Sequence, residues 1–187
     1  SFEARQDKFL RERRAIVKRA HSLIDDGMVI MLGPGTTALL FAEVLCKSEK
    51  HLTIITNGVQ EALTLSKNDN IRVVLTPGEV DRLEGFAWGH ETTDFISKFK
   101  SDMTVFCADG LAVSGVSEAD SRTVWTVRTM IEQSTQKMLL IDHFRFNNTG
   151  LEQICSLSDL DIVVSDQEPD TALFKKLKKN NVTFHRA

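Results

Sequence analysis

Cysteine is scarce in this sequence, and long apolar runs are absent. Its 187 residues include three cysteines, Cys46, Cys107 and Cys155, without a CxxC pair. This pattern argues against a disulfide framework and against a zinc knuckle, so we expect buried, inert thiols in a reducing cytoplasm. No apolar stretch approaches the roughly 18 residues that cross a bilayer, and the charged start of the chain is unlike a signal peptide. We therefore expect no membrane partner.

The sequence also lacks a strong excess of charge of one sign. Its 23 basic and 26 acidic residues give a net charge of −3. The charges are segregated, because residues 1–19 carry seven basic and three acidic side chains, and residues 175–187 carry five basic and no acidic ones. The body between them is acidic, and an acidic body does not bind DNA or RNA unaided. With 42% hydrophobic residues, the composition is that of one folded domain with at most a small appendage.

Short apolar runs alternate with amphipathic stretches from residue 28 onward. They predict strands over 28–32, 52–56, 71–75, 103–108, 137–142, 161–166 and 182–185, and helices over 36–47, 58–67, 91–99, 121–134 and 171–179. Strands that are apolar on both faces and separated by helices predict an α/β fold, with a mainly parallel sheet covered by helices on both faces. The weakly patterned stretches 76–90 and 109–120 predict either an extra hairpin or a ligand loop.

A long amphipathic helix is predicted ahead of the first strand. Its apolar residues run from Phe9 to Ile24 at near-helical spacing, and Gly27 is the expected C-cap. Because its first turns are charged around the whole helix, we expect them either to lie in solvent or to continue a segment upstream. We therefore divide the chain into a leading helix at residues 1–25 and an α/β domain at residues 26–187.

A glycine-rich loop follows the first predicted strand. In open α/β sheets, ligands bind beyond the carboxyl ends of the strands. Here Gly33 and Gly35 let the backbone approach a ligand, while Thr36, Thr37 and the start of the next helix form an anion site. Phosphate is the expected anion, and the alternative is a tight turn in which Thr36 caps the helix. The loop is not a Walker loop, because no GK[ST] follows.

Four further loops add polar groups at strand ends. They are Thr56–Gly58, Thr76–Glu79, Ala108–Gly110 and Asp142–Phe146. Asp109 suits sugar hydroxyls, Arg145 can hold a phosphate or carboxylate with two hydrogen bonds, and Arg128 in the preceding helix is a second candidate. Together the loops predict a pocket for a small, hydroxylated anion.

Signals for catalysis are weaker. Asp142 and His143 are adjacent, so in an extended chain their side chains diverge and cannot form a dyad. The sequence lacks a GxSxG elbow, an HExxH motif and the His/Cys spacing typical of a metal site. We therefore expect no catalytic residues, no metal and no cofactor.

The ordered motifs LGPGTT, TNG, PGE, WGH, ADG and LLIDHFRF resemble the effector-sensing domain of DeoR-family bacterial transcriptional repressors. The similarity extends from about Lys18 to Asp166. It implies a Rossmann-like fold shared with ribose-5-phosphate isomerase A and CoA transferases, and a phosphorylated sugar or sugar alcohol as effector in the control of carbohydrate catabolism. It also implies that operator DNA is bound by a winged helix-turn-helix missing from this chain, joined through a helix similar to residues 3–25. Symmetric operators favour a homo-oligomer, either a dimer or a tetramer.

The resemblance assigns site residues motif by motif. The family's GTT loop matches Gly35, Thr36 and Thr37, which are expected to hold the phosphate. Further matches are Thr56 and Asn57 to its TN pair, Gly78 to the second glycine of a turn, Asp142 to the aspartate of L-D-x-x-K-F, Arg145 to the lysine of that motif, and Arg128 to the second residue of a Lys-Arg pair. With Asp109, these residues form the predicted ligand site.

The chain departs from the family at Gly33, Pro77 and Val127, where an aspartate, a glycine and a lysine are usual, and at Arg145. These departures predict an atypical sugar phosphate or an altered phosphate geometry.

The alternative function is a sugar-phosphate isomerase of the ribose-5-phosphate isomerase type. In such an enzyme a carboxylate such as Asp109 or Asp142 would move a proton next to a carbonyl. Arg145 stands where a lysine is expected, and arginine is a poor proton carrier because it stays protonated. A sensor domain without enzymatic activity is therefore the preferred interpretation.

Overall fold

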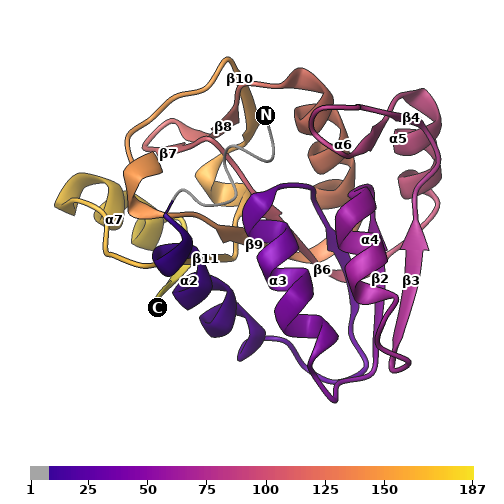
Figure 1. The fold of residues 1–187 in the computed structure, drawn as a ribbon. Coiled ribbons are helices and arrows are strands. Elements are labelled where there is room, and N and C mark those ends of the chain that lie inside the picture. Colours follow the sequence, from indigo (N-terminus) through magenta and orange to yellow (C-terminus); the bar gives the residue numbers. More distant parts are fainter. Residues whose placement is uncertain (1–8) are drawn as a thin grey trace.

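A parallel sheet forms the centre of the computed structural model, which describes residues 9–187 (Figure 1). Its seven strands lie in the order β12-β11-β9-β6-β1-β2-β3. They are β1 (Val29–Leu32), β2 (Leu52–Thr56), β3 (Ile71–Leu75), β6 (Ser101–Cys107), β9 (Ser134–Leu140), β11 (Ile162–Ser165) and β12 (Thr183–Arg186). Every neighbouring pair is parallel. The predicted α/β class and parallel sheet are confirmed.

Helices cover both faces of this sheet. They are α2 (Leu10–His21), α3 (Thr36–Cys46) and α4 (Val59–Leu65) on one face, and α5 (His90–Ser97), α6 (Ser121–Glu132) and α7 (Thr171–Lys179) on the other. Successive residues of β6 point to opposite faces, so Val105 packs into the core under α2 and α3, and Phe106 packs into the core under α6 and α7. The sheet is therefore buried on both sides, as its continuous apolar strands predict.

Strand order reverses between β1 and β6. Strands β2 and β3 are added on one side of β1, whereas β6, β9, β11 and β12 extend the sheet on the other side. Loops at the carboxyl ends of β1 and β6 diverge at such a switch point, which leaves a crevice where open α/β sheets bind ligands.

The two weakly patterned stretches each contain a hairpin. Strands β4 (Glu79–Val80) and β5 (Ala87–Trp88) pair with each other, while β7 (Gly110–Ala112), β8 (Gly115–Glu118) and β10 (Glu152–Cys155) form a small antiparallel sheet. This is one of the two outcomes predicted for these stretches. Strand β10 and the 3-10 turns η1 (His143–Arg145) and η2 (Leu157–Asp159) were not predicted, because they are short and lack an apolar run.

The leading helix differs from its prediction. Within the described residues it ends at His21 with Ser22 as C-cap, and residues 1–8 of the predicted span lie outside the described part. Gly27 does not cap it. It has a φ of 82° and donates its N–H to the carbonyl of His51 over 2.8 Å, in the turn into β1. The expectation for the first charged turns falls mainly on residues 1–8, outside the described part; within that part, Arg13 is only 4% exposed.

Candidate functional site

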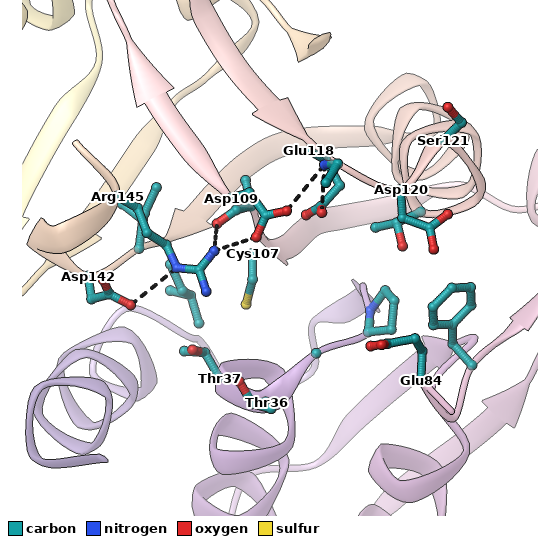
Figure 2. A pocket seen from close by; sticks show the side chains of 18 residues that line it. Thr36, Thr37, Glu84, Cys107, Asp109, Glu118, Asp120, Ser121, Asp142 and Arg145 are labelled. Atoms are coloured by element: carbon teal, nitrogen blue, oxygen red, sulfur yellow. Dashed lines mark hydrogen bonds and ion pairs between the residues drawn. The ribbon is translucent and has the colours of Figure 1, made fainter. Parts of the chain in front are cut away.

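A cavity of about 430 Å³ opens at the switch point between β1 and β6. Its lining comes from the loops after β1, β6 and β9, from the start of α6, and from the β4–β5 hairpin (Figure 2). The lining residues are Pro34, Gly35, Thr36, Thr37, Glu84, Phe86, Cys107, Ala108, Asp109, Glu118, Ala119, Asp120, Ser121, Thr123, Leu140, Ile141, Asp142 and Arg145. A cavity of this size accommodates a small metabolite.

The loop after β1 forms one end of the cavity. Gly35 has a φ of 136°, a conformation that favours glycine, and its carbonyl accepts the N–H of Leu39 over 2.9 Å to begin α3. The first N–H groups of a helix have no partner within the helix, and its dipole favours an anion there. Thr36 and Thr37 are the first two residues of α3 and line the cavity. The hydroxyl of Thr36 accepts a hydrogen bond from Nη1 of Arg13 over 2.6 Å.

A buried glutamate lies behind this loop. Glu61 of α4 is 1% exposed, and its Oε1 accepts the N–H of Gly35 over 3.0 Å. Burial raises the pKa of Glu61 to about 7, although hydrogen bonds from its own N–H and from Gly35 oppose the rise. The carboxyl group of Glu61, directly behind the anion loop, therefore gains or loses its proton near neutral pH.

Arg145 lies between two carboxylates on the opposite side of the cavity. Its Nη1 donates to Asp109 Oδ1 over 2.5 Å and to the carbonyl of Ala108 over 3.2 Å, and its Nε lies 3.4 Å from Asp142 Oδ2. Figure 2 shows the guanidinium between these carboxylates and facing the start of α3. Asp142 is 4% exposed, and its Oδ1 has no hydrogen-bond partner among the described residues. An unsatisfied buried carboxylate oxygen is costly, so this atom is suited to a ligand hydroxyl.

Asp109 and Glu118 form an acidic pair beside Arg145. The N–H of Ala119 is shared between Glu118 Oε1 at 2.9 Å and Asp109 Oδ2 at 3.2 Å. Burial and the neighbouring Asp109 raise the pKa of Glu118 to about 8. Burial would also raise the pKa of Asp109, but its bonds with Glu118 and Arg145 outweigh that effect and hold the pKa below its ordinary value. At neutral pH the pair therefore holds one proton, which Glu118 carries and shares with the ionised Asp109.

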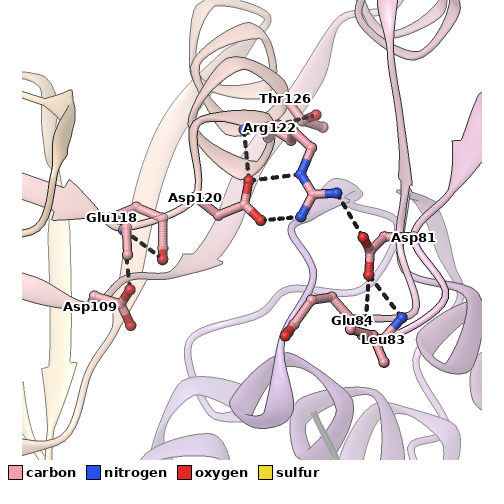
Figure 3. A network of polar contacts seen from close by, with 9 residues as sticks. Asp81, Leu83, Glu84, Asp109, Glu118, Asp120, Arg122 and Thr126 are labelled. Atoms are coloured by element: carbon pink, nitrogen blue, oxygen red, sulfur yellow. Dashed lines mark hydrogen bonds and ion pairs between the residues drawn. The ribbon is translucent and has the colours of Figure 1, made fainter. Parts of the chain in front are cut away.

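Arg122 fastens one wall of the cavity (Figure 3). Its Nη2 lies 2.6 Å from Asp120 Oδ2 at the start of α6, and its Nη1 lies 2.6 Å from Asp81 Oδ2 in the β4–β5 hairpin. Asp81 Oδ1 in turn accepts the N–H groups of Leu83 and Glu84 over 2.9 and 2.7 Å. The hairpin that contributes Glu84 and Phe86 to the lining is thereby attached to α6.

The structure brings six of the ten predicted site residues together in the lining: Gly35, Thr36, Thr37, Asp109, Asp142 and Arg145. The other four, Thr56, Asn57, Gly78 and Arg128, do not line the cavity. Thr56 and Asn57 are buried, and their side chains donate to the carbonyls of Leu32 and Ala87 over 2.8 and 2.9 Å.

Gly78 and Arg128 support the fold around the cavity and do not line it. Gly78 has a φ of 139°, and a side chain there would clash with Thr92. Arg128 pairs with Glu152 over 2.9 Å and donates to the carbonyls of Ile154 and Gln153, because α6 turns this side chain toward β10. The polar groups of Arg128 therefore join α6 to the small sheet.

Several residues of the site region were missed from sequence, among them Arg13, Glu61 and Glu118. Arg13 and Glu61 lie on the apolar stripes of their helices, beside Ile16 and Val17 and beside Ala62 and Leu65 respectively. A charged residue on an apolar stripe is a readable signal of a buried ionic role. Glu118 gave no such signal, because only the β7–β8 hairpin folds it back over Asp109.

The three cysteines differ in burial. Cys155 is buried, whereas Cys46 and Cys107 are only half-buried, contrary to expectation for those two. Burial raises the pKa of the Cys107 thiol, which lines the cavity, to about 12, so it is protonated at neutral pH. Across residues 9–187, no cluster of three or more His, Cys, Asp or Glu side chains is arranged to hold a metal ion. In the same span, no helix has both the length and the apolarity needed to cross a membrane.

These features define an α/β ligand-binding domain with a polar pocket at the sheet's switch point. The model of the family described as "DeoR C terminal sensor domain" matches residues 8–167. The glycerol-3-phosphate regulon repressor of Escherichia coli (strain K12) is 30% identical over 172 residues, covering 91% of this chain and 68% of the repressor. The chain therefore belongs to the DeoR family, as its sensor domain, and the resemblance seen in its motifs is confirmed.

One further relative and one solved structure are also similar to this chain. The HTH-type transcriptional repressor GlcR of Bacillus subtilis (strain 168) is 28% identical over 182 residues, covering 97% of this chain and 70% of GlcR. Ribose 5-phosphate isomerase A of Methanocaldococcus jannaschii superposes with a TM-score of 0.52 at 18% identity, over 72% of this chain. The chain spans only about half of that enzyme, 53%, and the similarity shows the shared fold alone.

Proposed function

We propose that this domain senses a phosphorylated sugar or sugar alcohol and thereby controls operator binding by a winged helix-turn-helix outside residues 1–187. In this proposal it acts in the cytoplasm as a dimer or tetramer, without enzymatic activity or a cofactor. Residues 1–25 serve as the linker and residues 26–187 as the effector domain. The relatives support a regulatory role, because their names describe transcriptional repressors, one of them of a glycerol-3-phosphate regulon.

The observation that carries the proposal is the placement of Arg145 opposite the start of α3. A phosphate at the Gly35–Thr37 loop would lie at the N-terminus of α3, where the helix dipole favours an anion, and would face this guanidinium. Asp109 and Asp142, which flank Arg145, would accept the hydroxyls of the sugar. One side of the cavity thus suits an ester phosphate and the other suits a polyol.

The ten predicted site residues take two roles in this proposal. The six that line the cavity contact the effector. Thr56, Asn57, Gly78 and Arg128 instead hold the framework around it through the contacts described above. An effector bound in this way would meet a proton donor at Glu118, which the family motifs did not include.

The direct test is a thermal-shift and calorimetric panel on the 187-residue protein. Probes are sn-glycerol 3-phosphate, glucose 6-phosphate, ribose 5-phosphate and their dephosphorylated counterparts. A cognate phosphate ester at a hundred times its Kd should stabilise the domain by about 2.7 kcal/mol, and the dephosphorylated compound should do much less. Absence of stabilisation by every phosphorylated probe would contradict the proposal.

A sugar-phosphate isomerase is the second candidate function. The specific feature that favours it is the pairing of a protonated Glu118 with an ionised Asp109 in the cavity, because isomerisation needs an acid and a base. An aldose–ketose interconversion assay with ribose 5-phosphate decides between the two. Turnover by the wild-type protein that is lost in Glu118→Gln would replace the sensor function with an isomerase.

A further inference from the structure

Helix α2 reaches the effector pocket through a buried cation. Arg13 is 4% exposed, and its Nη1 donates to the hydroxyl of Thr36, the first residue of α3. A hydroxyl has one proton to donate and two lone pairs to accept with. Since Arg13 occupies a lone pair, the proton of Thr36 remains available to a group in the cavity. The guanidinium therefore both orients this hydroxyl and adds positive charge behind the anion loop.

The same end of α2 contacts a second loop of the pocket. The ring of Phe9, at the N-cap of α2, stacks on Phe144 with centroids 3.8 Å apart and planes 17° from parallel. Phe144 lies in η1, next to Arg145, and its ring also packs against His143 at 3.8 Å. The leading helix thus contacts both loops that would grip a phosphate, the one after β1 and the one after β9.

The body of α2 is fixed to the domain independently of these two contacts. Ile16, Val17 and Ala20 are at most 1% exposed in the core shared with α3, β9 and β11. Arg19 reaches His185 in β12, with 3.0 Å between Nη2 and Nδ1. Contacts at the pocket end therefore act on the N-terminal turns of a helix that is already anchored further along.

We propose that Arg13 is a positioning residue of the effector site, which couples occupancy of the anion loop to the packing of helix α2. This inference rests on the proposed function, since it assumes that a phosphate ester binds at the loop. A phosphate that accepts the Thr36 proton strengthens the Arg13–Thr36 bond, because the two hydrogen bonds polarise each other. The coupling is reciprocal: the free energy by which docked α2 strengthens phosphate binding equals the free energy by which bound phosphate stabilises the docking of α2.

The test combines binding with hydrogen exchange on the 187-residue protein. Proteins are wild type, Arg13→Gln, Arg13→Lys and the matched control Arg14→Gln, which changes an exposed neighbour on the same helix. Probes are sn-glycerol 3-phosphate, glucose 6-phosphate, ribose 5-phosphate and inorganic phosphate. Kd is measured by calorimetry, and amide protection is followed separately for α2 and α3.

The inference predicts a specific pattern. For the phosphorylated probe that binds wild type most tightly, Arg13→Gln should raise the Kd about tenfold, because one charge-assisted contact is lost. The probe should still protect α3 in this variant but no longer α2. Arg13→Lys should restore part of both effects, and Arg14→Gln should behave as wild type.

Two results would overturn the inference in different ways. Wild-type affinity and unchanged protection of α2 in Arg13→Gln would overturn the role of Arg13 alone and leave the proposed function standing. Failure of wild type to bind any of the four probes would overturn the proposed function and this inference with it. If Arg13→Gln does not fold, Thr36→Val removes the same hydrogen bond from the other side, and protection of α2 that survives in it counts equally against the coupling.

Discussion

Glu61 offers the sharpest test of the electrostatics behind the anion loop. Its carboxyl group is buried and accepts the N–H of Gly35, and burial raises its pKa from 4.5 to about 7. The folded protein therefore holds this proton more tightly than the unfolded chain does. Below pH 4.5 the group is protonated in both states. As the pH rises toward 7 only the unfolded state releases the proton, so the wild type loses stability over that window.

The magnitude follows from the two pKa values. Each pKa unit corresponds to about 1.4 kcal/mol, and the linkage relation gives a loss of about 2.5 kcal/mol between pH 5 and pH 8. Glu61→Gln keeps an acceptor for Gly35 but has no proton to lose. Its free energy of unfolding minus that of wild type should therefore be about 2.5 kcal/mol larger at pH 8 than at pH 5, because only the wild type loses this stability.

Urea unfolding of both proteins at pH 5 and at pH 8 measures how the stability difference between Glu61→Gln and wild type changes with pH. A constant cost of the amide cancels, because it contributes equally at pH 5 and at pH 8. Glu43→Gln is the matched control, since Glu43 is exposed on α3, and it should follow the pH dependence of wild type. If the gap between Glu61→Gln and wild type is the same at pH 5 and pH 8, the assignment of a proton to buried Glu61 is wrong.

Three further predictions concern the cavity and its wall. Thr36→Ala should weaken the binding of a phosphate ester about tenfold and that of its dephosphorylated sugar little, as measured by calorimetry. The α6 control Thr129→Ala should change neither affinity. Equal losses for ester and sugar would contradict a phosphate-binding role of Thr36. Glu118 loses its proton above a pKa of about 8 and then adds a negative charge to the cavity. The affinity for a phosphate ester should therefore fall about fivefold from pH 7 to pH 9 in wild type but stay constant in Glu118→Gln. The same pH profile in both proteins would contradict a new negative charge on Glu118. Arg122→Gln should lower the free energy of unfolding, measured in urea, by about 1–2 kcal/mol. The control Arg82→Gln, in the hairpin that holds Asp81, should lower it by less than about 0.5 kcal/mol. Similar values for both variants would show that the ion pair with Asp81 does not stabilise the fold.

The sheet was predictable because parallel strands leave a strong local pattern. Runs such as Leu52–Thr56 and Ile71–Leu75 are apolar, short and followed by turn residues, and their predicted and observed bounds coincide. Strand β10 was missed because Glu152 and Gln153 make up half of it, and its place comes from pairing with β8. The early end of α2 was missed because the apolar spacing continues past His21 while the backbone turns.

The site was predictable only in part, because the local sequence pattern does not determine the order of the strands in the sheet. The loops after β1, β6 and β9 meet because these three strands are neighbours in the sheet. Thr56 ends β2 and Asn57 follows it, one strand further from the switch point, and their side chains bond to the framework instead of lining the cavity. Arg128 was one helix face away from the cavity, a distinction that depends on how α6 packs rather than on the residue type.

Anchoring of α2 in the core restricts how this domain can pass on a signal. To detach the helix would expose Ile16 and Val17, at roughly 1.5–3 kcal/mol for each large apolar side chain. Small tilts keep that surface buried and are therefore far cheaper. Arg13 and Phe9 lie on the N-terminal side of this anchored segment, where they contact the pocket loops. A helix rises 1.5 Å per residue, so a small tilt about the buried residues displaces each contact at the pocket end in proportion to its distance from them.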